Sequence, residues 1–425
     1  MEEGYSRELA LFERSIEDRG VQSRSYVEFQ PSVPIAEATA LEFRYSGNTS
    51  DYIDLSRTRL HLKFKIVNND GDTVTSSDNV TVINFPLQSL WSQVDIALQN
   101  QIITSGTNNL YAFKSYIDAI VKSKADDEDI LLPSQLFYKD TTGAMDGSPL
   151  VADNVELNAG ASERLIFTSK GVVDLIGPLY IDLAQQERLI LNAVPIHVKM
   201  WPNPDAFRLI DYSTEQNYKL TIVEAKLNLC LVKLYPSVVL GHAAALKQTP
   251  AIYEYDRSIM QSYQISKDSY SFSQDNLFQG LIPTSIIVAL VSSQAFSGHR
   301  KKNPFNFAHY NVKSIGFYID GQSVPHSKPM ELDFVKNNFL EGYNSLHDDN
   351  DDGLKLDRES FAQGYALFKF SLDSRYNKKL AIPVKHGLTR LEIVFCMPVI
   401  EPVTVIVYAS HPSLLQIDSA RNVLL

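Results

Sequence analysis

A β-hairpin pattern that occurs once in each half of the chain constrains the fold most strongly. In residues 85–104 apolar and polar residues alternate up to a Gln-Asn turn, after which a return strand begins. Residues 307–324 repeat this order around Asp320-Gly321. Alternation with a period of two is typical of a strand with one buried face. Asp-Gly favours a tight hairpin turn because both of its residues accept positive φ. The sequence therefore predicts two equivalent hairpins.

Each predicted hairpin is followed by apolar residues at helical spacing, in residues 110–123 and again in residues 330–343. Such spacing predicts an amphipathic helix in each half. A hairpin followed by a helix, repeated at a constant offset, indicates a tandem duplication.

The length of 425 residues exceeds what one hydrophobic core usually supports, so we expect about two domains. Each half offers about eight short strands with long connecting loops, and few helices alternate with them, which disfavours a parallel sheet. Eight strands in two antiparallel sheets form a jelly roll. The predicted fold is all-β: two tandem antiparallel eight-stranded jelly rolls with short inserted helices.

The domain boundaries follow from composition. The chain begins with a mixed-charge segment that ends near Pro31 and Pro34, and we expect it to order only against a neighbour. A second segment between prolines contains at most a short Ala-rich helix and reads as a linker. The predicted parts are an N-terminal arm (1–35), a first jelly roll (36–235), a linker (236–250), and a second jelly roll with a polar C-terminal tail from residue 413 (251–425).

Two shorter segments give further expectations. Residues 59–67 alternate strictly and predict a strand, on whose polar face His61 would be a solvated histidine. Residues 140–162 are rich in small and turn-forming types and predict a long exposed loop.

Charge and apolar runs limit the partners of the chain. A net charge of −11 disfavours direct binding of nucleic acid. The first twenty residues are charged throughout, unlike a signal peptide, and no apolar run reaches the roughly 18 residues that span a bilayer. Cys230 and Cys396 both lie in apolar runs and are predicted to be buried free thiols. We expect a soluble intracellular protein without membrane insertion.

One motif has the residue spacing of a known type of metal site. The spacing of a calcium-binding loop is met by Asp348, Asn350, Asp352, Gly353 and Glu359. Lys355 stands where such loops carry an apolar residue, and the following residues indicate a strand rather than a helix. We therefore favour an acidic surface loop, with an isolated calcium site as the alternative. No catalytic, cofactor-binding or metal site is predicted.

Two functions can be weighed against the residues, a hydrolase and a glycan-binding module. A hydrolase would need converging carboxylates, for which the candidates are Asp174, Asp182, Glu187 and Glu224. A glycan-binding module would use Trp91 and Trp201 as stacking platforms. The acids have Lys and Arg neighbours typical of structural ion pairs, and both tryptophans lie in apolar or Pro-rich surroundings typical of a core. No enzymatic activity is therefore predicted.

Six segments in a fixed order carry a resemblance to a known family: residues 51–66, 85–104, 134–140, 173–200, 231–246 and 361–373. Their sequences and order are similar to those of the major capsid protein of Polinton/Maverick elements and adintoviruses, which belong to the adenovirus-type double-jelly-roll lineage. The resemblance covers most of the chain.

The resemblance implies a structural protein of a virion. Three chains would form a homotrimeric, hexon-like capsomer of an icosahedral capsid, assembled inside the host cell beside neighbouring capsomers, a penton and minor capsid proteins. It implies no catalytic residue and no cofactor. We expect apolar residues of the inserted helices to contact other subunits, and each contact to bury well above ~2,000 Å². Deleting residues 1–35 should leave the trimer folded but impair shell assembly.

Overall fold

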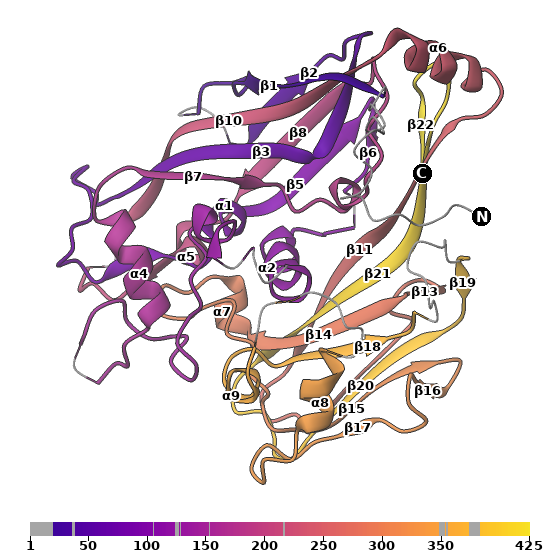
Figure 1. Ribbon diagram of the computed structural model, residues 1–425. Helices are drawn as coiled ribbons and strands as arrows, with labels where there is room; N and C mark the ends of the chain where they lie inside the picture. Colours follow the sequence, from indigo (N-terminus) through magenta and orange to yellow (C-terminus); the bar gives the residue numbers. More distant parts are fainter. Residues whose placement is uncertain are drawn as a thin grey trace, which may run out of the picture.

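The computed structural model shows two β-sandwiches in one chain, with a helix between them (Figure 1). It describes residues 20–425 apart from 36–38, 105, 124–126, 128, 153, 216, 348–352, 354–355 and 374–382. Strands β1 to β10 build the first sandwich, and strands β11 to β22 build the second.

The first sandwich consists of two four-stranded antiparallel sheets and a short ribbon. One sheet has the order β1 (Val21–Phe29), β10 (Lys219–Leu234), β3 (Asp51–Val67) and β7 (Val173–Pro178). The other has the order β2 (Leu41–Tyr45), β8 (Ile196–Pro202), β5 (Trp91–Leu98) and β6 (Gln101–Ile102). The ribbon pairs β4 (Val80–Val82) with β9 (Leu209–Asp211).

The second sandwich repeats this plan. One sheet has the order β11 (Ala251–Ile265), β21 (Val403–Ile417), β14 (Ser285–Ser292) and β18 (Leu367–Ser371), with β22 (Val423–Leu424) on β21. The other has the order β12 (Ser271–Asp275), β20 (Thr389–Phe395), β15 (Val312–Ile319) and β16 (Gln322–Val324), with β17 (Met330–Glu331) on β15. A ribbon pairs β13 (Leu281–Ile282) with β19 (Lys385–His386).

The two sandwiches share one strand order. Counting only the eight strands of the two main sheets along the chain, each sandwich has one sheet in the order first-eighth-third-sixth and one in the order second-seventh-fourth-fifth. Eight antiparallel strands arranged in two sheets in this way form a jelly roll. The predicted fold class is therefore confirmed, and we call the two sandwiches the first roll and the second roll.

The duplicated hairpin is confirmed and occupies the same place in both rolls. Its first copy is the pair β5–β6 and its second copy is the pair β15–β16, the fourth and fifth strands of their rolls. The turns contain left-handed residues, with φ of 56° at Gln99, 49° at Asp320 and 82° at Gly321. Both rolls carry their longest insertion directly after this hairpin.

The insertions differ in their helices. In the first roll, α2 (Tyr111–Lys122) confirms the predicted helix. In the second roll, the helix predicted over residues 330–343 is wrong, because only α8 (Leu340–Ser345) forms there, after β17 and a tight turn. The Asp333 carboxylate accepts a hydrogen bond from the Lys336 amide at 3.0 Å, and Asn337 is left-handed at a φ of 56°. These features close a turn that interrupts the helical register.

The other helices are short. They are α1 (Pro86–Ser89), α4 (Ala159–Thr168), α5 (Asp205–Arg208), α6 (Pro236–Ala245), α7 (Ser293–Ser297), α9 (Arg358–Ala362) and the 3₁₀ turns η3 (Pro133–Gln135) and η4 (Asp182–Gln185). None of the helices in the described ranges is long and apolar enough to cross a membrane. The segment predicted as an exposed loop over 140–162 is partly buried, since Met145 and Asn158 are covered and Asn158 caps α4.

Two predicted terminal segments contain strands. Residues Val21–Phe29 of the predicted arm form β1, which pairs with β10 along its whole length. Deleting residues 1–35 would remove this strand from the sheet. The expectation that the trimer still folds after the deletion therefore applies only to deletion of residues 1–19. At the other end, β21 continues to Ile417 and pairs with β11 as far as Ala251.

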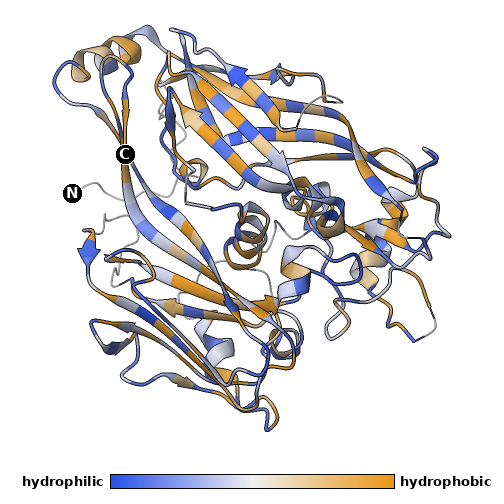
Figure 2. Ribbon diagram, turned by 180° about the vertical axis from the view of Figure 1, so that it is seen from behind, coloured by the Kyte–Doolittle hydropathy of each residue, from blue (hydrophilic) through white to orange (hydrophobic). Residues whose placement is uncertain are grey.

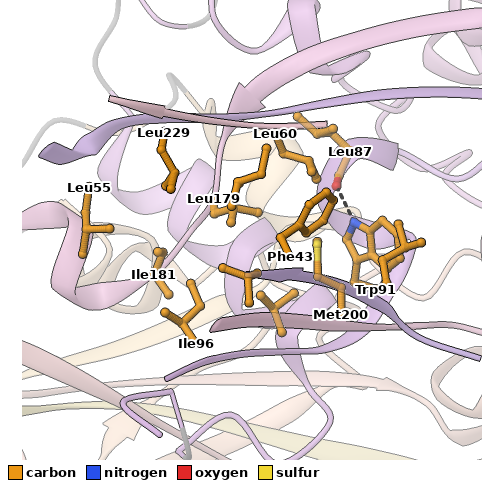
Figure 3. Packing of buried hydrophobic residues seen from close by; sticks show 14 of the residues in the cluster. Phe43, Leu55, Leu60, Leu87, Trp91, Ile96, Leu179, Ile181, Met200 and Leu229 are labelled. Carbon is orange, nitrogen blue, oxygen red and sulfur yellow. Dashed lines mark hydrogen bonds between the residues drawn. The ribbon is translucent and has the colours of Figure 1, made fainter. Parts of the chain in front are cut away.

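The first roll has an alternating core pattern. Leu60 and Leu229 of one sheet face Ile96 and Met200 of the other (Figure 3). Trp91 is fully buried there, and its Nε1 donates a hydrogen bond to the Leu87 carbonyl at 2.9 Å. Hydrophilic residues alternate with hydrophobic ones along these strands because one face of each sheet is open to solvent (Figure 2).

The central strands of the second roll lack this alternation. Every residue of β14 after Ser285 is buried, and so is every residue of β21 from Val403 to His411. Val288 and Val405 point into the core of the second roll, whereas Ile287 and Ile406 point to the opposite side. Strands buried on both faces read as continuous apolar runs. The outer face of this sheet must therefore be covered by another part of the chain.

The two cysteines lie in different environments. Cys230 is buried in β10, as predicted, and its pKa is raised by burial. Cys396 is exposed just after β20, so the prediction that it is buried is wrong. Its apolar neighbours alternate across the sheet, and this alternation leaves the thiol on the solvent side.

One half-buried and one buried histidine make the stability of the second roll sensitive to acid. Burial lowers the pKa of His309 and of His411 to about 4, and Arg257 opposite His411 adds to the effect there. The unfolded chain takes up these protons near pH 6.5 but the folded chain does so near pH 4, so stability is lost as the pH falls through this window. We expect a loss of about 2–3 kcal/mol per histidine.

Thermal unfolding at pH 7.5 and pH 4.5 measures this loss. The variant His411→Phe keeps a ring against Phe278 but cannot titrate. It should show about half of the wild-type drop in melting temperature between the two pH values. An unchanged drop would show that His411 is not responsible.

Candidate functional site

Helix α2 lies between the two rolls and is the longest helix in the described part of the chain (Figure 1). Every one of its residues except Lys122 is buried. The second roll covers the face of α2 that points away from the first roll, so the side chains of α2 form a junction between the two rolls. This junction is the candidate functional site because it holds the rolls together.

An aromatic cluster forms the apolar part of the junction. Tyr116 of α2 stacks on Phe305 of the second roll, with ring centroids 4.0 Å apart and planes at 5°. Phe113 stacks on Phe296 at 5.3 Å and meets the edges of Phe207 and Phe305. Offset stacked and edge-to-face pairs of this kind each contribute about 0.5–1.5 kcal/mol beyond the area that they bury.

The outer face of the second roll completes this cluster. Side chains from β14 and β21 pack against α2 and join it in one core, separate from the cores of the two rolls; they are Ile287, Ala289, Val291, Ile406 and Tyr408. The expectation that α2 would find apolar partners in other subunits is therefore wrong. Its apolar residues are buried within a single chain.

A buried ion cluster forms the polar part of the junction. The Lys114 ammonium lies 2.7 Å from Asp118 Oδ2 and 2.8 Å from Asp182 Oδ1, and it donates to the Tyr180 carbonyl at 2.7 Å. Burial lowers the pKa of Lys114, but the two carboxylates outweigh this effect and raise it. Lys114 is therefore charged and fully paired.

The same cluster reaches into the second roll. Tyr408 of β21 donates a hydrogen bond to Asp118 Oδ1 at 2.9 Å, and Lys122 lies 2.9 Å from the same oxygen. Ser258 of β11 donates to Asp182 through its amide at 2.7 Å and through its hydroxyl at 2.8 Å. Burial tends to raise the pKa of Asp118, but Lys114 and Lys122 hold it below its usual value. Burial raises the pKa of Tyr408 to about 12, so its hydroxyl remains a donor.

A second buried network joins the insert of the first roll to the loop that carries Phe305. Arg164 of α4 donates to Asp140 Oδ1 at 2.8 Å, and Asn303 donates to Asp140 Oδ2 at 2.8 Å. All three side chains are buried. In both networks the charged groups of the first roll neutralise one another, and uncharged groups of the second roll (Ser258, Asn303 and Tyr408) complete them by hydrogen bonds, an arrangement that suits rigid attachment of the rolls.

The four carboxylates considered for a hydrolase do not form one cleft. Asp182 belongs to the α2 cluster, and Glu187 is exposed just beyond η4. Asp174 and Glu224 lie on the outer face of the first roll, 2.5 Å from His61 and 2.8 Å from Lys63. Hydrogen bonds from Lys226 and Lys63 lower the pKa of Glu224 to about 2. His61 is thus half-buried and paired rather than simply solvated.

The other predicted candidates are also separated. Trp91 is a core residue, as expected, whereas Trp201 is half-exposed beneath the Lys199 ammonium, 5.0 Å from its ring. Asp348, Asn350 and Asp352 of the calcium motif lie outside the described residues. Glu359 lies in α9, a single turn that precedes β18. No cluster of metal-ligating side chains occurs among the residues that the structure describes.

The spacing of charged residues in the sequence points to the α2 cluster, although the cluster is not among the predictions above. Lys114, Asp118 and Lys122 are spaced four residues apart, so they fall on one face of the helix. Residues 110–123 otherwise read as strongly apolar, and charges on such a helix point to buried pairing. The partners on β11 and β21 could not be identified in this way.

Comparisons with known proteins agree with this fold. No protein-family model matches the chain. An uncharacterized protein of Caenorhabditis elegans is 25% identical over 348 residues, which cover 78% of this chain and 79% of the relative.

Solved structures of viral shells are similar over nearly the whole chain. The Sputnik virophage structure superposes with a TM-score of 0.64 at 11% identity, covering 100% of this chain and 92% of that chain. The Faustovirus major capsid protein gives 0.61 at 8% identity, covering 96% and 92%. The mavirus major capsid protein gives 0.58 at 10% identity, covering 100% and 94%. The chain therefore has the fold of these capsid proteins, two jelly rolls included.

Proposed function

We propose that this chain is a major capsid protein, a structural and non-enzymatic component of an icosahedral viral shell. The observation that carries the proposal is the full-length likeness to double-jelly-roll capsid proteins, in which both rolls and their order are retained. From the resemblance to Polinton/Maverick elements and adintoviruses we infer that it belongs to a virus-like element of that type.

A homotrimer is the assembly that we infer. Within one chain, α2 of the first roll covers the outer face of the β11-β21-β14-β18 sheet. The equivalent sheet of the first roll, β1-β10-β3-β7, has a solvent-accessible outer face that carries His61, Lys63 and Asp174. In a ring of three chains the insert of one second roll would cover this face of the next chain. Six rolls would then form a pseudo-hexagonal, hexon-like capsomer.

Exposed apolar residues support this arrangement. Ile176 of β7 is 44% exposed on the outer face of the first roll. Val335 in the second-roll insert is 78% exposed, and Leu340 of α8 is 49% exposed. Contact between these two regions would remove apolar surface from water and bring the charged groups beside Ile176 into a polar rim.

The capsomer would occupy the virion capsid, assembled inside the host cell. Neighbouring capsomers, a penton and minor capsid proteins are the expected partners. The net charge of −11 suits a shell whose genome contacts are made by other, basic proteins.

The mass of the purified protein tests the proposal directly. Light scattering after size-exclusion chromatography should give about three times 47.8 kDa, and negative-stain microscopy should show hexagonal particles or shells. A chain that remains monomeric at micromolar concentration and forms no particles would overturn it.

An interface variant locates the contact. Ile176→Asp places a charge on a face that is open in the single chain but covered in the trimer, so the monomer should fold while trimer formation weakens at least about 100-fold. Val151→Asp is the matched control, since Val151 is 88% exposed in a loop. Sedimentation velocity over a concentration series measures both. Equal trimer formation by both variants would rule out this face.

A further inference from the structure

Helix α6 is unusual because it is apolar and yet uncovered. It connects β10 to β11, and none of its residues is buried. Val238 and Val239 rest on the core of the first roll, but Leu240 is 70% exposed and the alanines that follow it are also exposed. An exposed apolar helix of this kind marks a docking surface when a suitable occupant is near.

A pocket of about 400 Å³ lies between α6 and the two rolls. Its wall is formed mainly by apolar side chains from α6, β10 and β11, including Leu234, Ala245, Leu246 and Ile252. The polar groups at its edge are already engaged: His242 is hydrogen-bonded to Tyr52 at 3.0 Å, and Tyr253 donates to the Leu189 carbonyl at 3.1 Å. The pocket is thus suited to apolar side chains rather than to a polar ligand.

The N-terminal segment of the chain begins beside this pocket. Val21 pairs with Leu234, which lines the pocket, and the Tyr235 amide donates to the Gly20 carbonyl at 3.2 Å. Residues 1–19, which precede Gly20 in the sequence, lie outside the described residues. The four steps from Ile16 to Gly20 span at most about 14 Å when extended, and a helix from Phe12 to Ile16 adds about 6 Å, whereas α6 is about 15 Å long. Residues 9–16 can therefore reach the pocket of their own chain.

The sequence of this segment matches the pocket in chemistry. Leu9, Phe12 and Ile16 recur at the spacing of one helical face, and amphipathic helices insert such anchors into apolar grooves. Residues 1–19 contain six acidic and three basic residues. The pocket is bordered by Arg188, and Lys247 stands between two of its lining residues in sequence. Arg188 lies 3.7 Å from Glu254, so the attraction to the acidic segment comes mainly from Lys247.

We propose that residues 9–16 of each chain form an amphipathic helix that docks on α6 and fills this pocket with Phe12 and its apolar neighbours. The inference goes beyond the capsid function and does not depend on it, because it concerns a contact within one chain. Docking would cover the apolar connection between the rolls and direct the remaining N-terminal residues away from it.

Disulfide trapping in the full chain tests the contact. Phe12→Cys and Ala245→Cys are combined with Cys396→Ser, which removes the exposed native thiol. After mild oxidation, more than half of the chains should carry an internal cross-link, seen as faster migration without reducing agent. The control pairs Ala10→Cys with Ala245→Cys, because Ala10 lies on the opposite face of the predicted helix and should cross-link at least about 10-fold more slowly.

A second measurement covers the case of a cross-link that fails for geometric reasons. The fluorescent apolar probe anilinonaphthalene sulfonate should bind the variant Phe12→Asp several-fold more than the wild type, because the pocket is released. Ala10→Asp should bind the probe as the wild type does. Cross-linked dimers would assign the pocket to the arm of another chain. That result, equal cross-linking of both pairs, or equal probe binding by wild type and Phe12→Asp would overturn the proposal.

Discussion

Replacement of Lys114 by methionine should lower the free energy of unfolding by about 3–5 kcal/mol, because it leaves buried carboxylates without their counter-charge. Asp182 would lose its ammonium partner at 2.8 Å. Asp118 would keep the hydrogen bond from Tyr408, but Lys122 would be its only cationic partner. The methionine side chain is close to lysine in length and fills the same space. The loss would therefore report the missing charge rather than a cavity.

Urea unfolding followed by the fluorescence of buried Trp91 measures this loss. The matched control is Lys63→Met, which removes the same group from a half-exposed pair with Glu224 on the outer face of the first roll. Exposed pairs contribute little because water and salt screen them, so the control should unfold at the wild-type urea concentration. Equal stability of Lys114→Met and wild type would mean that the cluster is not a structural element of the junction.

The strand pattern in the sequence was sufficient for the fold. Both hairpins were predicted at their correct places because alternation and turn residues are local properties of the chain. The strict alternation of residues 59–67 also predicted part of β3 correctly. The repeat of hairpin and insertion predicted the duplication, and the equal strand order of the two rolls confirms it.

The sequence also contains a pattern that distinguishes the two rolls. The apolar runs that became β14 and β21 do not alternate, whereas the run that became β3 does. This difference distinguishes a sheet that is covered on both faces from a sheet with one open face. The non-alternating runs of the sequence therefore indicate by themselves that the second roll is the one covered by another part of the chain.

The candidate site could be predicted only in part. The charges of α2 were visible in the sequence, but Tyr408 is 290 residues from its partner Asp118, and no local pattern relates them. The prediction of a second inserted helix was wrong for the opposite reason. Its apolar spacing was helical, but Asp333 and Asn337 favour a turn, and this local preference prevailed over the pattern.

The aromatic part of the junction should couple the rolls as strongly as the ion cluster does. Phe305 comes from the second roll, yet it packs on Tyr116 and Phe113 of α2 and on Phe207 of the first roll. Phe305→Ala should lower the free energy of unfolding by about 3–5 kcal/mol, because the rigid surroundings cannot close the cavity. The loss should fall on both rolls, since the shared core belongs to both.

Hydrogen exchange separates this coupling from ordinary destabilisation. Phe317→Ala removes the same ring from the second roll's own core, where Phe317 is equally buried and does not contact the junction core. Both variants should lose protection in the second roll, but only Phe305→Ala should also lower the protection of the α2 amides, by about 100-fold or more. If α2 stays fully protected in Phe305→Ala, the rolls are stable separately and the junction merely joins them. If it opens, a single cooperative unit comprises both rolls, and the proposed trimeric capsomer would have three rigid subunits rather than six independent rolls.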